Sequence, residues 1–264
     1  MGVRRVAEHT RRPLAAVLLS GGMDSTVLLA HYAAAGYRLL AVSVDYAQRH
    51  GERELAAAGA VAAYYGAERL PVDMRAVGAL LCGSALTDPT VQVPSGHYEA
   101  PSMRATVVAN RNNLLAHVLV SVVMPLGADV AALGVHAGDH AIYPDCRPPW
   151  VDALGESVRV GNEGYGPPRV EAPFVHLHKW QIAALGAALG APLHLTYSCY
   201  QGQQEHCGTC GTCVERREAF ADAGLPDPTE YQIDGHEGDP PQGAAEPALS
   251  TGAVSGAAAG KAAR

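Results

Sequence analysis

Lysine is almost absent from this 264-residue chain, which carries it only at positions 179 and 261 and uses arginine seventeen times. The ammonium of lysine is a compact, flexible point charge, whereas the guanidinium of arginine is a planar fork, so the two cations bind phosphate differently. A chain that otherwise prefers arginine has reason to keep Lys179 where an ammonium is needed. The alternative is that Lys179 is an ordinary residue on a helix surface.

Long apolar runs are also missing, since none reaches the ~18 residues of a membrane-spanning helix. Arg4, Arg5, Arg11 and Arg12 precede an apolar stretch that is too short for an export signal and runs straight into a glycine turn. The formal charge of −7 argues against a general nucleic-acid binder. We therefore expect a cytoplasmic protein without membrane or nucleic-acid partners, and its 48% apolar composition is ample for a core.

Strand-like and helix-like segments alternate along the chain. The strand-like segments are 14–19, 38–45, 69–72 and 130–135, and the helical ones are 24–35, 52–65, 110–126 and 213–223, with a long loop at 91–103. This alternation predicts a Rossmann-like, doubly wound parallel sheet covered by helices on both faces. Such sheets bind ligands beyond the carboxyl ends of their strands, so the polar segments that start at Ser20, Asp45 and His136 should meet in one crevice.

The segment from Ser20 to Thr26 reads Ser-Gly-Gly-Met-Asp-Ser-Thr and joins a predicted strand to a predicted helix. Backbone N–H groups can approach an anion there, because a side chain at Gly21 or Gly22 would block phosphates or forbid a positive φ. No lysine lies near, which excludes the Gly-Lys-Ser/Thr nucleotide loop. The pattern resembles the pyrophosphate loop of ATPases that adenylate a substrate, and it predicts ATP with bridging Mg²⁺. A small-residue turn without a ligand is the alternative.

Four cysteines lie within fifteen residues, with the spacing C-x7-C-x2-C-x2-C. They are Cys199, Cys207, Cys210 and Cys213. This spacing predicts a closed, structural Zn²⁺ site, with an iron–sulfur cluster and redox disulfides as alternatives. Of the other two cysteines, Cys82 is expected to be a small buried apolar residue. Cys146 lies in a polar loop, where it could contact a substrate.

These features divide the chain into four segments. They are an N-terminal extension at 1–13, an ATP-binding α/β domain at 14–190, a zinc-binding segment with a terminal helix at 191–234, and a tail at 235–264. The tail is rich in Gly, Ala, Pro and Ser with almost no apolar bulk, and this composition predicts disorder.

Several strings together resemble the 7-cyano-7-deazaguanine synthases, which make the nitrile precursor of queuosine and related deazapurines. They are Ser20–Thr26, Asp45-Tyr46-Ala47-Gln48-Arg49-His50, Arg111-Asn112, Tyr143-Pro144-Asp145-Cys146-Arg147, and Thr196–Tyr200 with the three later cysteines. The resemblance runs from about Leu14 to Tyr231. The chain departs from the family at Ala47, where glycine is usual, and at 109–110 and 140–142, which alters the shape of the substrate pocket.

The resemblance implies a ligase that converts 7-carboxy-7-deazaguanine, ammonia and ATP into the nitrile through an adenylated acid and an adenylated amide, and it suggests a homodimer. It implies an ATP-binding set of Leu19, Ser20, Gly21, Gly22, Met23, Asp24, Ser25, Thr26, Val27, Leu28, Leu29, Asp45, Gln48 and Arg49. Lys179 and Arg111 would neutralise the transferred phosphoryl group, and Asp24 would be a partner of Mg²⁺.

The same resemblance places the substrate against Tyr143, Asp145 and Arg147. Asp145 would accept hydrogen bonds from ring N–H groups, and Arg147 would bind a carboxylate through two hydrogen bonds. The alternative is that the two residues form a plain salt bridge within the loop. His50 either relays protons or caps a helix. We expect four further histidines, which belong to none of these motifs, to be ordinary polar residues. They are His97, His136, His176 and His178. The remaining alternatives are a tRNA thiolase or amidotransferase subunit and a non-catalytic, zinc-braced nucleotide-binding homologue.

Overall fold

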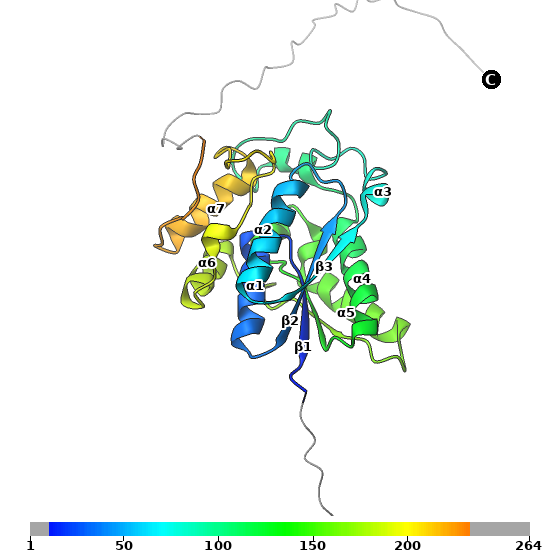
Figure 1. The fold of residues 1–264 in the computed structure, drawn as a ribbon. Helices are drawn as coiled ribbons and strands as arrows, with labels where there is room; N and C mark the ends of the chain where they lie inside the picture. The colour runs from blue at the N-terminus through cyan, green and yellow to red at the C-terminus, as the bar shows by residue number, and fades with distance from the viewer. Residues whose placement is uncertain (1–10, 233–264) are drawn as a thin grey trace, which may run out of the picture.

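A parallel sheet lies at the centre of the computed structural model, which describes residues 11–232 (Figure 1). The strands in this part of the chain are β1 (Leu14–Leu18), β2 (Arg38–Asp45), β3 (Glu68–Asp73), β4 (Val130–Ala132) and β5 (Arg169–Glu171). Their order is β3-β2-β1-β4-β5, and every neighbouring pair is parallel. The predicted doubly wound α/β fold is therefore confirmed.

Helices cover both faces of this sheet, as Figure 1 shows. One face carries α1 (Met23–Ala34), α2 (Gly51–Tyr64) and α6 (Lys179–Ala188), with α7 (Gly211–Asp222) packed against α6. The other face carries α4 (Arg111–Val123) and α5 (Pro148–Gly161). Helix α3 (Arg75–Gly78) is a single turn that follows β3. Short 3₁₀ turns occur at Pro101–Thr106, Met124–Leu126, Ala137–Ala141, Pro144–Cys146 and Leu193–Leu195.

The central strand β1 is apolar throughout because both of its faces are covered. Successive side chains of a strand point to opposite faces. Ala15 and Val17 accordingly join the core cluster beneath α1, α2 and α6, while Leu14 and Ala16 join the cluster beneath α4 and α5. A continuous apolar run is therefore the expected pattern for this strand, and alternation with polar residues is not.

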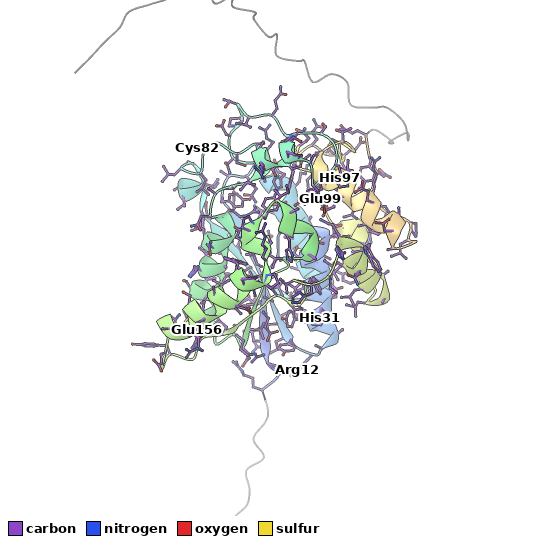
Figure 2. The ribbon with its side chains drawn as sticks, turned by 180° about the vertical axis from the view of Figure 1, so that it is seen from behind. Arg12, His31, Cys82, His97, Glu99 and Glu156 are labelled. Atoms are coloured by element: carbon purple, nitrogen blue, oxygen red, sulfur yellow. The ribbon has the colours of Figure 1, made fainter. Side chains whose placement is uncertain are left out.

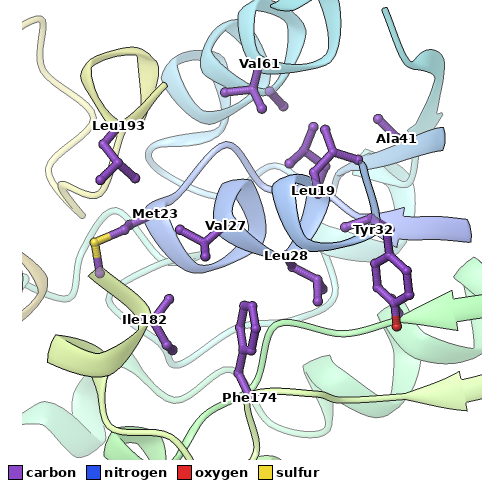
Figure 3. Close-up of a cluster of buried hydrophobic side chains, with 14 of the residues drawn as sticks. Leu19, Met23, Val27, Leu28, Tyr32, Ala41, Val61, Phe174, Ile182 and Leu193 are labelled. Carbon is purple, nitrogen blue, oxygen red and sulfur yellow. The ribbon is translucent and has the colours of Figure 1, made fainter. Parts of the chain in front are cut away.

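Helix α1 fixes the glycine turn by packing into the core. Val27 and Leu28 are fully buried between Val61 of α2 and Ile182 of α6 (Figure 3). Leu29 is buried in the same cluster. These three residues of α1, which the family resemblance included in the ATP-binding set, lie in the hydrophobic core and hold the helix whose N-terminus faces the site.

Several elements differ from the sequence prediction. Helices α5 and α6 and strand β5 were not predicted. Helix α6 packs on both α1 and α7, and apart from Lys179 and Gln181 its residues are apolar or glycine, so no 3.6-residue alternation of apolar and polar residues is visible. The predicted helix at 110–126 stops at Val123 and continues as a 3₁₀ turn around Pro125, which cannot donate the next helical hydrogen bond. The predicted strand at 130–135 ends at Ala132.

Most of the predicted extension at 1–13 and the whole predicted tail at 235–264 lie outside the described residues. Within residues 11–232, no helix combines the length and the apolar character that crossing a membrane requires.

The side of the sheet on which successive strands are added changes at β1. From β1 the next strands β2 and β3 lie on one side, and β4 and β5 lie on the other. At such a switch point the loops after neighbouring strands diverge to opposite faces and leave a crevice at the carboxyl ends. The segments after β1, β2 and β4 therefore border one opening.

Ala47, in the turn after β2, provides a test of local strain. It is exposed and has a φ of 59°, at a position where the resembled motif carries glycine. A left-handed backbone conformation costs an L-residue about 1–2 kcal/mol. Glycine avoids this cost, but part of the gain is offset because glycine has more conformational freedom to lose when the chain folds. We expect Ala47→Gly to raise the free energy of unfolding by about 0.5–1 kcal/mol, measured by urea denaturation. Ala56→Gly, on an exposed site inside α2, should lower it by about 1 kcal/mol. Equal effects of the two changes would contradict this account.

Candidate active site

A cavity of about 240 Å³ lies at the carboxyl ends of β1, β2 and β4. The structure brings together there the three polar segments that follow these strands, together with the start of α4 and residues beside the cysteine cluster. From the glycine turn it is lined by Leu19, Ser20, Gly22, Met23, Asp24 and Ser25. The cavity therefore contains both the N-terminus of α1 and the residues that surround the switch point.

The glycine turn leaves the first turn of α1 open to this cavity. Ser20 Oγ accepts a hydrogen bond from the N–H of Gly22 (3.2 Å) and lies 3.1 Å from Ser25 Oγ. Gly22 is the N-cap residue, and no side chain caps the helix. The N–H groups of the first helical turn have no intrahelical partners, so they can bind an anion together with the positive end of the helix dipole.

The two glycines of the turn serve different purposes. Gly21 has a φ of 91°, and a Cβ there would lie 2.5 Å from the carbonyl oxygen of Glu54. Its own carbonyl accepts a hydrogen bond from the N–H of Tyr197 (2.9 Å). Gly22 has a φ of −74°, so the expected need for a positive φ applies to Gly21 alone. Gly22 instead lines the cavity without filling it.

Lys179, the first residue of α6, lies between two carboxylates. Its Nζ is 2.7 Å from Glu215 Oε2 and 3.3 Å from Asp24 Oδ2. Burial opposes the positive charge, but the attraction of Asp24 and Glu215 outweighs it and raises the pKa of Lys179. Burial likewise favours the neutral form of Asp24, yet the positive charge of Lys179 lowers the pKa of this carboxyl. The ammonium is therefore charged and held in one place.

The second oxygen of Asp24 is free to bind a cation. Asp24 Oδ1 is buried and has no hydrogen-bond partner among residues 11–232. A buried carboxylate oxygen without a partner is costly unless a ligand binds it. Carboxylate oxygens beside phosphate groups are the usual protein ligands of Mg²⁺. The residues present therefore fit a magnesium ion beside the glycine turn.

His136 belongs to this network, contrary to the expectation that it is an ordinary polar residue. Its side chain is buried directly after β4, and Nδ1 accepts a hydrogen bond from the N–H of Gly138 (3.1 Å). Its proton is therefore on Nε2, which faces Asp139 Oδ2 at 3.5 Å and Asp24 Oδ2 at 3.7 Å. The signal in the sequence was its position at the carboxyl end of a central strand.

The other end of the cavity is built around Arg111, the first residue of α4. Its Nη1 donates to the hydroxyl of Tyr46 (2.8 Å), and its Nε donates to Asn112 Oδ1 (2.9 Å). Asn112 Nδ2 donates to Cys146 Sγ (3.3 Å). The hydroxyl of Tyr143 lies 2.7 Å from Thr106 Oγ1. This end of the cavity combines one cation with aromatic walls.

Burial raises the pKa of the Cys146 thiol. A nucleophilic cysteine needs a lowered pKa, because the thiolate is the reactive form. Cys146 therefore has the environment of an inert thiol. Cys82, which was expected to be buried, is exposed on the loop after α3 (Figure 2), so that expectation is wrong.

Other predicted site residues lie outside the cavity. Arg49 donates to the carbonyls of Ala85, Asp88 and Val91 at 2.9–3.1 Å, so its guanidinium binds a loop. Arg147 donates twice to the carbonyl of His140 (2.9 and 2.7 Å). Asp45, Asp145, Gly21 and Thr26 are also absent from the cavity wall. Arg49, Arg147 and Asp145 are therefore not part of this cavity wall, and their roles in binding a ligand stay predictions.

His50 and Gln48 do line the cavity. His50 is the N-cap residue of α2 by position, but its side chain makes no capping hydrogen bond. Its Nε2 lies 3.5 Å from Glu54 Oε1, and Gln48 Nε2 donates to Glu54 Oε2 (3.0 Å). Of the two roles considered for His50, side-chain capping of the helix is therefore not observed.

The four-cysteine cluster can hold a metal ion. All four sulfur atoms are buried and lie within 4.8 Å of one another. Cys213 Sγ is 3.5 Å from Cys210 Sγ and 4.0 Å from Cys207 Sγ. A tetrahedral ion with Zn–S bonds of about 2.3 Å needs sulfurs about 3.8 Å apart. These separations exclude disulfides, whose sulfurs are about 2 Å apart, and they fit zinc.

The cysteine cluster, defined as Cys199, Cys207, Cys210 and Cys213, is joined to the cavity wall. Tyr197 and Ser198 precede Cys199, and Thr212 Oγ1 donates to the carbonyl of Ser198 (2.7 Å). All three line the cavity. Helix α7, which begins at the cluster, also carries Glu215, the partner of Lys179. A metal in the cluster would therefore brace the residues that place the lysine.

Comparison with known proteins identifies the family of the chain. The family described as "Queuosine biosynthesis protein QueC" matches residues 14–224. Proteins named 7-cyano-7-deazaguanine synthase from Brucella ovis and Brucella canis are each 48% identical to the chain over 217 residues, which cover 82% of this chain and 92% of theirs. Among solved structures, an NMN synthetase from Francisella tularensis has a TM-score of 0.44 and 15% identity, covering 82% of this chain and 79% of that chain. This last likeness is distant and carries no functional argument.

Loss of one cluster sulfur should affect both stability and activity. We expect Cys213→Ser to lower the free energy of unfolding by at least about 2 kcal/mol, because an incomplete site binds its metal weakly. The matched control is Cys82→Ser at an exposed free cysteine, which should change it by less than about 0.5 kcal/mol. Urea denaturation and metal analysis measure both variants. A Cys213→Ser protein with unchanged stability and no metal would contradict a structural ion.

Proposed function

The chain belongs to the family of the queuosine biosynthesis protein QueC, and we propose that it acts as a 7-cyano-7-deazaguanine synthase. It is an ATP-dependent carbon–nitrogen ligase that converts 7-carboxy-7-deazaguanine and ammonia into 7-cyano-7-deazaguanine. The observation that carries this proposal is the 48% identity to named synthases over 82% of the chain. The cavity supports it, since it holds an anion-binding helix end and a fixed ammonium together.

The reaction requires activation because hydroxide is a poor leaving group. A carboxylate oxygen attacks the α-phosphorus of ATP, which forms an acyl adenylate and releases pyrophosphate. Ammonia then attacks the acyl carbon, loses a proton and expels AMP, leaving the amide. The amide oxygen attacks the α-phosphorus of a second ATP, and loss of AMP and two protons gives the nitrile. Both adenylations develop negative charge on pyrophosphate.

Residues at the glycine-turn end would stabilise that charge. The open N–H groups at the start of α1 border the cavity, where they would bind the pyrophosphate, and Ser20 and Ser25 would add hydroxyl donors. Lys179 supplies a positive charge that two carboxylates keep in place. Asp24 Oδ1 would hold Mg²⁺, which supplies further positive charge to the phosphates when bound. The residues are thus arranged before the substrate binds.

The remaining parts of the proposal concern the protein's other ligands and its state. The cysteine cluster would hold a structural zinc ion, since four thiolates leave no open position. The family resemblance supports a homodimer in the cytoplasm that works on small molecules and binds no nucleic acid. A tRNA thiolase is disfavoured, because burial raises the pKa of Cys146, the cysteine in the cavity wall.

Product analysis tests the reaction directly. Incubation with 7-carboxy-7-deazaguanine, ammonium and ATP should yield the nitrile, with two AMP and two pyrophosphate molecules formed for each nitrile. Mass spectrometry and nucleotide chromatography measure these products. ADP and orthophosphate in place of AMP and pyrophosphate would refute an adenylating enzyme.

Lys179 should contribute through its charge. We expect Lys179→Met to lower kcat about 100- to 1000-fold, comparable to the loss of one preorganised charge-stabilising donor. The matched control is Lys261→Met, which changes the chain's other lysine and should leave kcat unchanged. Urea denaturation checks that the variant stays folded. A folded Lys179→Met protein with the parent kcat would exclude this role.

A further inference from the structure

Arg111 is a cation in the cavity wall without an acidic partner. Its hydrogen bonds go to the hydroxyl of Tyr46 and the amide oxygen of Asn112, both of which are neutral. No aspartate or glutamate among residues 11–232 forms an ion pair with it within 4.0 Å. Glu54, whose carboxylate is close enough to be influenced by Arg111, is itself bound by Gln48 and His50.

The two cations of the cavity are thus held in opposite ways. Lys179 is ion-paired with Glu215 and Asp24 before any ligand binds, whereas Arg111 has no ion pair with an acidic side chain among residues 11–232. Removing a cation from water is costly unless an anion compensates for it. The free charge of Arg111 therefore favours an anionic ligand at its end of the cavity.

The surroundings of Arg111 indicate which anion this is. The walls at this end come from Tyr46, Leu115, Tyr143 and Trp150, which offer apolar and aromatic surface suited to a flat ring. The open N–H groups suited to phosphates belong to a different helix, α1, which packs on the opposite face of the sheet from α4. A planar guanidinium matches a carboxylate through two parallel hydrogen bonds.

We propose that Arg111 binds the carboxylate of the 7-carboxy substrate and makes the first adenylation depend on that negative charge. This inference rests on the proposed function. It gives Arg111 the task that sequence reasoning gave to Arg147, whose guanidinium is bound to the carbonyl of His140 outside the cavity. It also replaces the expectation that Arg111 neutralises the transferred phosphoryl group.

The chemistry of the two half-reactions makes the roles distinguishable. The acid carries a negative charge when it attacks the α-phosphorus, and the amide of the second half-reaction is neutral. A residue that binds the substrate carboxylate therefore acts on the acid and much less on the amide. A residue that binds the α-phosphate acts on both, because both half-reactions use ATP.

The experiment compares the acid and the amide as substrates of the full-length enzyme. We expect Arg111→Gln to lower kcat/KM about 10- to 100-fold for 7-carboxy-7-deazaguanine, the range of one charge-assisted hydrogen bond. The same variant should change kcat/KM for 7-amido-7-deazaguanine by less than about threefold, with an unchanged KM for ATP. Arg111→Lys, which keeps the charge, should retain more activity on the acid than Arg111→Gln. The ratio of acid to amide activity does not depend on the fraction of folded enzyme.

Two further arginines provide controls. Arg147→Gln and Arg159→Gln should both preserve the parent ratio of acid to amide activity, since Arg147 binds a backbone carbonyl and Arg159 pairs with Glu156 on the surface. Calorimetric binding of acid and amide without ATP gives the same comparison without turnover. Equal losses on both substrates in Arg111→Gln, or a ratio changed by Arg147→Gln instead, would overturn the proposal. A parent enzyme that forms no nitrile from either substrate would refute the proposed function itself.

Discussion

The ion cluster of Lys179, Glu215 and Asp24 is the interaction on which the site depends. Its three residues come from α6, α7 and α1, so the lysine is placed only when all three helices are packed. A buried ammonium with one partner removed leaves an uncompensated charge, which destabilises the fold strongly. The same contact therefore joins the stability of the helix layer to the position of the positive charge beside the start of α1.

The parallel sheet explains why this cluster and Arg111 share one cavity. The order β3-β2-β1-β4-β5 sends the chain to opposite sides of β1, so α1 and α4 begin at the same edge of the sheet while covering opposite faces. One helix presents open N–H groups there, and the other presents a guanidinium. Two groups that are suited to binding anions and are far apart in the sequence are thereby brought together without a separate domain.

Local signals made much of this arrangement predictable. The glycine turn, the cysteine spacing and the alternation of strands with helices each depend on neighbouring residues, and the sequence showed all three. The contacts that Glu215 and His136 make with Lys179 and Asp24 depend on tertiary packing. No local sequence pattern therefore predicted these contacts. Arg49 and Arg147 lie in motif strings, but their guanidinium groups bind backbone carbonyls of the neighbouring loops. Where a long cationic side chain ends is decided by the loop it packs against.

The scarcity of lysine acquires a physical meaning in this setting. Three arginines of the motif strings form planar hydrogen bonds, to loop carbonyls at Arg49 and Arg147 and to neutral side chains at Arg111. Lys179 instead touches two carboxylates from different helices at 2.7 and 3.3 Å, and a compact ammonium can do this because its donors are not confined to one plane. A guanidinium is bulkier and confines its donors to one plane, so it fits this position between two carboxylates less readily. The geometry of the three-helix junction therefore favours lysine, even in a chain that otherwise uses arginine.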